Sequence, residues 1–384
     1  MGGELIFFGG GLVIFHGLCV FLQKLCVESI DIKVVKKILT NILKYLVPVI
    51  IGVGLFYFLY ANVDVEEMKR VIKSDVNYWW FLPVIVVSTF SHIFRAMRWR
   101  LQLRAIGVDA PLSALVNSIF GTYAVNLIFP RLGEVWRTGY IADRQKASFT
   151  TVLGSMVADR LTDTVTVLLL TVFTFFLAQD AFMQFLSTYP QIKDGIENML
   201  KSPWLWIAAV VMVGALVALF TMKTQNGLIL KVRTMVLNLW NGFSAITKMD
   251  GKWWFLFYTV LVWGCYYLQL YIATFAFSFT ADLGVVPILV LFVLSSIGMG
   301  VPTNGGLGSW HIAIIFGLSL YGVGVFNTAS FDSNASAFAM LVWGVQTVLL
   351  IVLGIYAFAS MQIDRSRIKS GKTVVNTSGD GMKL

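Results

Sequence analysis

The sequence contains few residues of the kinds that bind metals or form crosslinks. Three cysteines and three histidines occur in 384 residues. Cys19, Cys26 and Cys265 lie in or beside apolar segments without paired spacing, so the sequence predicts neither a disulfide framework nor a zinc site. The histidines are isolated from one another as well. We therefore expect no metal ion and no other cofactor.

Signals for binding nucleotides or nucleic acids are also missing. The glycine-rich stretch GGLGSW lacks the Lys-Ser/Thr pair of a phosphate-binding P-loop. Charged residues make up only 13% of the chain, and the formal net charge is +9. In so apolar a chain, an excess of Lys and Arg indicates membrane orientation and some attraction to anionic lipid headgroups. We expect membrane lipids as partners, and no nucleic acid.

Long apolar runs are what the chain has in abundance. Hydrophobic residues account for 58% of it and aromatic residues for 14%. Continuous runs of this length predict an all-α, polytopic integral membrane protein with about six or seven full transmembrane helices and two re-entrant broken-helix hairpins. The runs lie at 5–22, 46–60, 79–94, 111–129, 150–177, 204–222, 254–280, 284–301, 309–325 and 336–360.

The distribution of charge predicts which connections lie on each side of the membrane. Basic residues cluster at 33–44, at 95–104 (Arg95, Arg98, Arg100 and Arg104), at 223–252 and in the tail at 362–384. The positive-inside rule places all of these clusters in the cytoplasm. The loops at 61–78 and 178–202, together with Asp282 and Asp332, would then face out. We expect a multi-pass protein of the cell inner membrane with a cytoplasmic C-terminus.

These features divide the chain into three parts. We assign 35–361 to one transmembrane domain and 362–384 to a polar, basic cytoplasmic tail. Residues 1–34 are glycine-rich and apolar, and two interpretations remain open for them. They form either an additional N-terminal transmembrane helix or a stretch that precedes the true start codon, and we favour the second.

The segment 111–149 does not fit a simple span. Both of its ends are basic, so the chain must enter and return, yet its second half contains Arg131, Glu134 and Arg137. That half cannot cross lipid. We interpret it as a broken hairpin that opens to the cytoplasm and turns near NLIFPRLGE, where Pro130 and a glycine interrupt the helix.

A second interrupted stretch, 284–325, lies between two outward-facing acidic residues and is split by MGVPTNGGLGSW. Two full spans would give the same topology. Because no charge would hold the turn in cytoplasmic water, we favour a second re-entrant hairpin that opens outward. One broken hairpin from each side resembles the plan of inverted-repeat transporters, in which discontinuous helices meet near the midplane and form the substrate site.

Ionisable residues also lie inside an apolar run of spanning length, SMVADRLTDTVTVLLLTVFTFFL. Asp159 and Asp163 share a helix face with three hydroxyl residues, and Arg160 lies at its edge. Such groups are costly inside a bilayer and mark a pathway or binding site by default. With Arg131, Glu134 and Arg137, which are spaced three apart, they make a formally neutral set of three acids and three bases. Arginine suits phosphate because its planar fork donates bidentate hydrogen bonds.

Plainer interpretations of these residues stay open. The charges after Pro130 could belong to an interfacial helix, and the intramembrane trio could be an ion network that only fixes helix packing. Asn304, Gly305 and Gly306, which we include with Asn126 among the candidate substrate-binding residues, could form a flexible loop or a close helix contact. His311 fits a satisfied core histidine better than a proton carrier.

Three motifs carry a family resemblance. They are N-x-x-x-P-R-x-G-E-x-x-R from Asn126 to Arg137, D-R-x-x-D from Asp159 to Asp163, and P-x-x-G-G-x-G from Pro302 to Gly308. Together they resemble the transmembrane-domain family of lysylphosphatidylglycerol synthases, also called the flippase-like domain family, over roughly 40–360. The second motif of the family usually begins with Glu, where this chain has Asp159.

The resemblance implies transbilayer movement of a lipid. Synthases of the family carry a C-terminal aminoacyl-transfer domain; this chain ends in a short polar tail, so we expect a stand-alone member without lipid aminoacylation. Our leading hypothesis is a flippase or transporter for a phosphate-bearing lipid, either a phospholipid or a polyprenyl phosphate. Two alternatives remain: a membrane-embedded lipid-headgroup transferase that uses Asp159 or Asp163 as general base, and a non-transporting scaffold for envelope biogenesis. We expect a transporter-like protein more than an enzyme, with no catalytic residues.

Overall fold

The computed structural model describes residues 49–370, apart from 62, 130, 189, 222–226, 228, 231–232, 234–248, 250 and 325–330. The chain divides into two compact units, Met1–Ile50 and Ile51–Leu384, and all the contacts reported below lie in the second. The apolar run at 5–22, the basic cluster at 33–44, Pro130 and the end of the polar tail fall outside the described residues.

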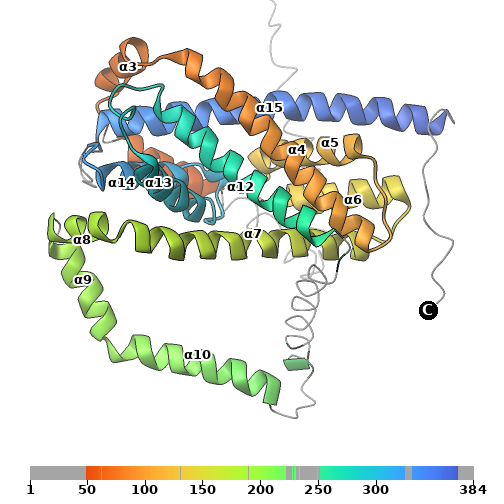
Figure 1. Cartoon of the computed structure of the whole chain (residues 1–384), viewed down its shortest axis with the longest axis horizontal. Helices are drawn as coiled ribbons and strands as arrows, with labels where there is room; N and C mark the ends of the chain where they lie inside the picture. Colours follow the sequence, from red (N-terminus) through yellow and green to blue (C-terminus); the bar gives the residue numbers. More distant parts are fainter. Residues whose placement is uncertain are drawn as a thin grey trace, which may run out of the picture. The chain divides into compact units, whose positions relative to one another are not determined.

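Every regular element of the described residues is helical, which confirms the all-α fold. After a first helix, Val49–Ala61, the elements are α3 (Val65–Ser74), η1 (Tyr78–Trp80), α4 (Phe81–Ala105), α5 (Leu112–Ile128), α6 (Leu132–Gln145), α7 (Phe149–Leu177), α8 (Gln179–Thr188), α9 (Pro190–Lys201), α10 (Pro203–Thr221), α12 (Lys252–Thr274), α13 (Val285–Gly298), η2 (Asn304–Gly306), α14 (Ser309–Ser319) and α15 (Ser333–Lys369). Figure 1 shows their course.

Four of these helices, α4, α7, α12 and α15, are each long and apolar enough to cross a membrane. Two bent pairs qualify only when each is taken as one span: Val49–Ala61 with α3, bent by 88°, and Lys193–Lys201 with Pro203–Leu219, bent by 56°. The described part of the chain therefore supplies four to six spans and is a multi-pass membrane protein. The larger count, six spans, equals the smaller of the two numbers expected from the sequence, six or seven.

Two pairs of short helices form the expected broken hairpins. α5 packs against α6, and α13 packs against α14. The four helices have 17, 14, 14 and 11 residues, and a bilayer requires about 20 residues. Each pair thus brings the chain in and back without completing a span, so the second interrupted stretch is a hairpin rather than two full helices.

Close contact within the first hairpin depends on Gly133. A Cβ atom on Gly133 would lie 2.2 Å from the carbonyl oxygen of Thr122 and 2.8 Å from Oδ1 of Asn126. Because no side chain fits there, the start of α6 lies directly against α5. In the second hairpin, Gly306 and Gly308 both have φ of +79°, a left-handed conformation that favours glycine.

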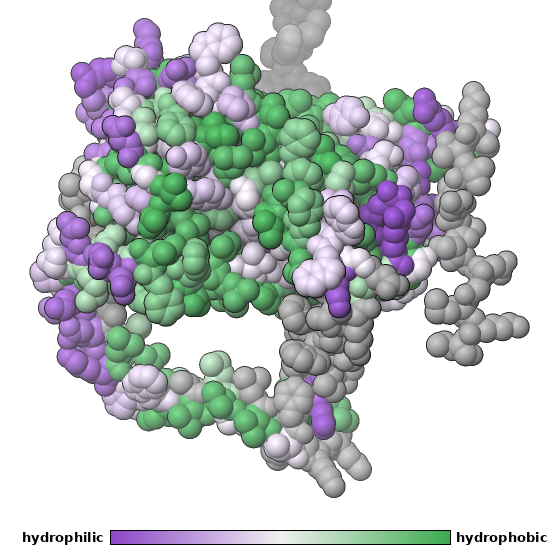
Figure 2. All heavy atoms as spheres, viewed as in Figure 1, coloured by the Kyte–Doolittle hydropathy of each residue, from purple (hydrophilic) through white to green (hydrophobic). Residues whose placement is uncertain are grey.

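The long helices expose an apolar surface, and α4 also buries several polar side chains. α4 and α12 pack along much of their length. On the face drawn in Figure 2, apolar side chains cover the middle of these helices and hydrophilic side chains gather where the helices end. By contrast, the residues of α4 that are buried inside the bundle include Ser88, His92, Arg95 and Arg98. Polar and ionisable side chains of membrane helices usually face the interior of the bundle in this way, because contact with lipid is costly for them.

The largest differences from the predicted boundaries are at the ends of α4 and α15. The third apolar run was expected to end at 94, but α4 continues to Ala105. The last run was expected to end at 360, with a polar tail from 362, but α15 continues as one helix to Lys369. Polar and charged residues have adequate helix propensity, so the ends of the apolar runs do not mark the ends of these helices.

Candidate functional site

The centre of the candidate site is an ion-pair cluster between α4 and α7. Arg95 and Arg98 lie one turn apart on α4 and face Asp159 and Asp163, one turn apart on α7. Arg98 donates to Asp159 Oδ1 from Nε at 3.0 Å and from Nη2 at 2.6 Å, and to Asp163 Oδ1 from Nη2 at 2.7 Å. Arg95 Nη1 donates to Asp163 Oδ2 at 2.6 Å and lies 3.6 Å from Asp159 Oδ2. The two helices are thereby joined by charge-assisted bonds inside the bundle.

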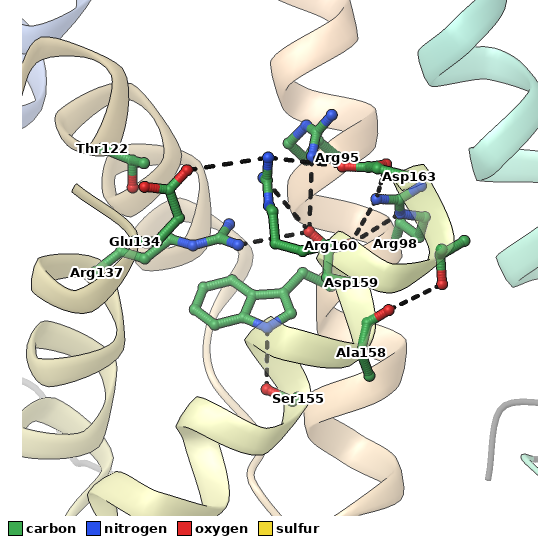
Figure 3. Close-up of polar contacts among 12 residues, drawn as sticks. Arg95, Arg98, Thr122, Glu134, Arg137, Ser155, Ala158, Asp159, Arg160 and Asp163 are labelled. Atoms are coloured by element: carbon green, nitrogen blue, oxygen red, sulfur yellow. Dashed lines mark hydrogen bonds and ion pairs between the residues drawn. The ribbon is translucent and has the colours of Figure 1, made fainter. Parts of the chain in front are cut away.

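α6 and α7 add two more arginines and one more carboxylate (Figure 3). Arg137 Nη2 donates to Asp159 Oδ2 at 3.4 Å. Arg160 lies between the carboxylates: its nitrogens are 3.7 Å from Asp159 Oδ2, 3.7 Å from Asp163 Oδ2 and 4.0 Å from Glu134 Oε1. Arg160 therefore has several partners but holds none of them closely.

Aromatic rings fix three of the guanidinium groups. Arg137 lies over the ring of Trp99, 4.5 Å from its centre, and Trp99 Nε1 donates to Ser155 Oγ at 3.1 Å. Arg95 lies over Tyr266 and Arg98 over Phe255, each 5.7 Å from the ring centre. Cation–π contacts of this kind become stronger where water is excluded.

The cluster carries a surplus positive charge. It contains four arginines (Arg95, Arg98, Arg137 and Arg160) and three carboxylates (Glu134, Asp159 and Asp163), so its formal charge is +4 − 3 = +1. The six residues identified from the sequence are formally neutral, but the cluster has a different membership. Arg131 makes no ion pair with its described carboxylates, and α4, whose arginines were expected in a cytoplasmic loop, contributes two cations.

Several donors of the cluster are buried and unused. Arg98 Nη1, Arg137 Nε, Arg137 Nη1 and Arg160 Nε have no hydrogen-bond partner among the described residues. The Arg98, Arg137 and Asp159 side chains are 0% exposed, whereas Arg160 is 36% exposed. Buried N–H groups are rarely left without an acceptor, since the loss of hydration is costly. The cluster therefore has the capacity to bind an additional acceptor, with Arg160 on its accessible side.

Asn126 and Glu134 hold the edge of the cluster in place. Asn126 Nδ2 donates to Glu134 Oε2 at 3.2 Å, and Asn126 Oδ1 accepts from the backbone N–H of Gly133 at 2.8 Å. One asparagine thus orients the carboxylate and binds the first turn of α6. The first motif of the sequence has a clear structural role, which leaves Glu134 directed toward Arg160.

The remaining predicted residues meet at the tips of the two hairpins. Asn304 Nδ2 donates to the carbonyl oxygens of Leu127, at 3.1 Å, and of Ile128, at 3.2 Å. Arg131 Nη2 donates to the carbonyl oxygen of Gly300 at 2.8 Å. The last carbonyls of α5, which have no acceptor role inside their own helix, are thus used to bind the other hairpin.

Arg131 differs from its prediction. It was expected to project from the same helix face as Glu134 and Arg137, but it precedes α6 in a left-handed conformation, φ 62°, and is exposed. It makes no ion pair with the described carboxylates of the cluster. The residues Gly305 and Gly306 share the tip with it, and Gly305 accepts a hydrogen bond from Trp343 Nε1 at 2.8 Å. Arg131 and Asn304 thus connect the two hairpins, and Gly305 binds α15; none of them makes an ion pair or hydrogen bond with the described residues of the ion cluster.

Sequence reasoning missed Arg95 and Arg98, which are 3% and 0% exposed. They were assigned to a cytoplasmic basic cluster because the apolar run before them ends at 94. A run of 16 residues is shorter than the roughly 20 that a span requires, and this shortfall was the available signal. Extending the helix by three turns would have placed both arginines inside it.

His311 is completely buried among aromatic rings, and neither of its ring nitrogens has a hydrogen-bond partner within the described part of the chain. His311 is therefore a core residue, as expected, but within the described residues its ring nitrogens lack the hydrogen bonds that a core histidine usually makes. No group of three or more His, Cys, Asp or Glu side chains suited to a metal ion occurs among the described residues.

Comparison with known proteins assigns the chain to a family. The model of the lysylphosphatidylglycerol synthase TM region matches residues 45–354. No curated protein and no solved structure matches the chain. The matched range includes both hairpins and every residue of the ion cluster, and it covers most of the 384 residues. The chain belongs to the family of lysylphosphatidylglycerol synthase TM regions.

Proposed function

We propose that the protein moves a phosphate-bearing lipid, a phospholipid or a polyprenyl phosphate, between the leaflets of the cell inner membrane. The C-terminus lies in the cytoplasm in this proposal. The family relates the chain to lipid handling, and the buried arginine cluster supplies the chemistry for a lipid phosphate.

The observation that carries the proposal is the surplus of buried positive charge. The phosphodiester of a phospholipid, or the singly ionised phosphate of a polyprenyl phosphate, carries one negative charge and would bring the cluster from +1 to zero. Its oxygens would also accept from the unused N–H groups of Arg137 and Arg160. Burial of an anion in a membrane protein is costly unless it is paired and hydrogen-bonded, and here both conditions would be met.

The four arginines fall into two groups by the length of their contacts. Arg95 and Arg98 make carboxylate contacts of 2.6 to 2.7 Å and are structural counterions. Arg137 has one contact, at 3.4 Å, and the contacts of Arg160 are 3.7 Å or longer. The second group is the one able to exchange a carboxylate for a lipid phosphate, and Arg160 is the residue that a headgroup would reach first.

The contact between the hairpin tips would serve as a gate. Three side-chain hydrogen bonds join the tips, two from Asn304 and one from Arg131. Breaking them would let the hairpins separate, and alternate opening on the two sides would expose the cluster to each leaflet in turn. A lipid gradient or downhill exchange would supply the driving force.

Reconstitution into liposomes tests the proposal. Fluorescent phosphatidylglycerol in one leaflet is followed by chemical quenching of the outer leaflet, and we expect the wild type to equilibrate the probe. Arg160→Gln should slow this movement by about tenfold or more, because it removes the accessible donor of the cluster. Arg70→Gln is the matched control, since Arg70 is 73% exposed and pairs only with Glu67 among the described residues.

Equal rates for the wild type and Arg160→Gln would refute the role of the cluster. Formation of a modified lipid by the purified protein, without movement between leaflets, would replace the proposal with the headgroup-transferase alternative.

A further inference from the structure

A polar cavity lies where α4 and α15 end and α5 begins. Its volume is about 530 Å³, and none of its lining residues belongs to the ion cluster. The charged residues of its wall are Arg100, Asp109, Arg144, Asp364 and Arg367, which give a formal charge of +3 − 2 = +1. A volume of this size is in the range of small-molecule sites.

Both carboxylates of the wall are already neutralised. Asp364 accepts from Arg144 Nε at 2.7 Å and from Nη2 at 3.1 Å, a bidentate pair between α15 and α6. Asp109 accepts from Arg104 Nε at 2.9 Å. That hydrogen bond holds the pKa of Asp109 below its usual value, so the carboxylate stays charged at neutral pH. The cavity therefore cannot bind a cation through these groups.

Two arginines of the wall retain free donors. Arg100 lies 3.6 Å from Asp109 at its closest, and its buried Nε has no partner among the described residues. Arg367 makes no ion pair with any described carboxylate. One comes from the end of α4 and the other from the end of α15, so a ligand between them would join the two helices.

Neutral donors complete the wall. Tyr140 is 6% exposed; its hydroxyl interacts with the charge of Arg144 but makes no hydrogen bond of acceptable geometry among the described residues. The N-terminus of α5 also lines the cavity through Ser113 and Ala114. Its N-cap is Pro111, which has no side-chain acceptor. The Pro111 carbonyl oxygen accepts from the N–H groups of Ala114, at 3.1 Å, and Leu115, at 3.2 Å, so the N–H of Ser113 is the donor left for a ligand in the cavity. An anion satisfies such N–H groups and favours the positive end of the helix.

We propose that this cavity binds a phosphate mono- or diester through Arg100, Arg367, Tyr140 and the N-terminus of α5, as an anion site separate from the intramembrane cluster. The site stands on its own contacts and does not depend on lipid movement. It lies at the end of the molecule where basic residues concentrate. Either the headgroup of a lipid or a soluble phosphate ester could supply the same chemistry.

Binding measurements on the full chain in a phosphate-free detergent test the site. The probes are glycerol 3-phosphate, which is soluble, and dioctanoyl phosphatidic acid, which carries the same phosphate on a lipid. Tyr140→Phe removes only the hydroxyl and Arg367→Gln only an exposed charge, so both variants should fold. We expect each to weaken binding by about fivefold or more, as loss of a charge-assisted hydrogen bond does.

Two controls separate this site from general electrostatics and from the ion cluster. Lys252→Gln removes one positive charge from a residue that does not line the cavity. Lys252 follows Gly251, which lies beside Leu101 of α4. Arg160→Gln alters the intramembrane cluster. Both should leave the affinity within about twofold of the wild type.

The two probes distinguish the source of the phosphate. Saturable binding of both, weakened by Tyr140→Phe and Arg367→Gln, supports a site for the free phosphate ester; binding of the lipid alone, with the same response, supports a headgroup site. The proposal is overturned if the folded wild type binds neither probe at millimolar concentration. It is also overturned if Lys252→Gln weakens binding as much as Arg367→Gln does. Loss of binding in Arg160→Gln only would place the anion in the intramembrane cluster, which favours the proposed function and refutes the cavity.

Discussion

Replacing Asp159 by asparagine should destabilise the protein strongly, and more than the same change at Asp163. Asp159 is fully buried and lies within 4.0 Å of Arg95, Arg98, Arg137 and Arg160. The substitution keeps the size of the side chain but raises the charge of the cluster from +1 to +2. Removing one partner of a buried ion pair typically costs about 3–5 kcal/mol.

The matched change at Asp163 provides a reference for the expected loss of stability. Asp163→Asn produces the same change in charge, but Asp163 is 13% exposed and contacts three of the arginines. Water can partly compensate there, so we expect about 2 kcal/mol, the value of a hydrogen bond to a charged group. At about 2 °C per kcal/mol for a chain of this size, the melting temperature should fall by roughly 6–10 °C for Asp159→Asn and roughly 4 °C for Asp163→Asn.

Thermal denaturation of the detergent-solubilised protein, followed by fluorescence-detected size exclusion, measures both values. Arg137 provides a further check, because Asp159 is its one carboxylate partner within 4.0 Å among the described residues. Adding Arg137→Gln to Asp159→Asn should cost less than the sum of the single changes, with a coupling of about 0.5–3 kcal/mol. A melting temperature of Asp159→Asn within 2 °C of the wild type, or a larger fall for Asp163→Asn, would contradict the assigned geometry.

Two further predictions concern the hairpins. Gly133→Ala should lower the melting temperature or abolish folding, because the new Cβ would lie 2.2 Å from a backbone oxygen. Gly139→Ala on the same helix meets nothing within 4 Å, so it should be neutral or stabilise the protein by up to about 1 kcal/mol. Equal effects of the two changes would disprove the close approach of α5 and α6. Asn304→Ala should loosen the contact between the hairpin tips, since it removes two hydrogen bonds worth about 0.5–1.5 kcal/mol each. Hydrogen exchange of the residues at the end of α5 should then become faster, and unchanged exchange would show that the tips are held by other contacts.

The fold could be predicted from the sequence where a single property decides the structure. Long apolar runs predicted the spans α7, α12 and α15, and charge inside the run after 111 predicted the first hairpin. Such features are local, because bilayer thickness and the cost of a charge in lipid act on each segment separately. Helix ends are less local. α4 extends past its apolar run because Asp159 and Asp163, some sixty residues later, neutralise the arginines of its last turns.

The candidate site could be predicted only in part for the same reason. Glu134, Arg137, Asp159, Arg160 and Asp163 were identified because charge near apolar sequence is conspicuous, and the structure brings these five side chains together. Arg95 and Arg98 were missed because a basic cluster after an apolar run is the ordinary sign of a cytoplasmic loop. Two arginines spaced three apart lie on one face of a helix, as do two aspartates spaced four apart, so the two pairs can contact each other across two packed helices. Which pairs face each other depends on tertiary packing that spacing alone does not determine.

The formal charge of the cluster affects both the binding and the release of a lipid phosphate. Three carboxylates cannot fully neutralise four guanidinium groups, so in every arrangement one arginine lacks a full partner. The short contacts of Arg95 and Arg98 assign that deficit to Arg137 and Arg160. A neutral cluster would have no surplus charge for a phosphate, and a cluster without nearby carboxylates would hold the phosphate too tightly to let it go. In the proposed function, Glu134, which lies 4.0 Å from Arg160 and is oriented by Asn126, would pair with Arg160 again after the lipid leaves. On this reasoning Glu134→Gln should preserve binding of a lipid phosphate but slow its release, so the transport rate in liposomes should fall while the amount of co-purified anionic lipid rises; a parallel fall in both would show that Glu134 supports the fold and takes no part in release.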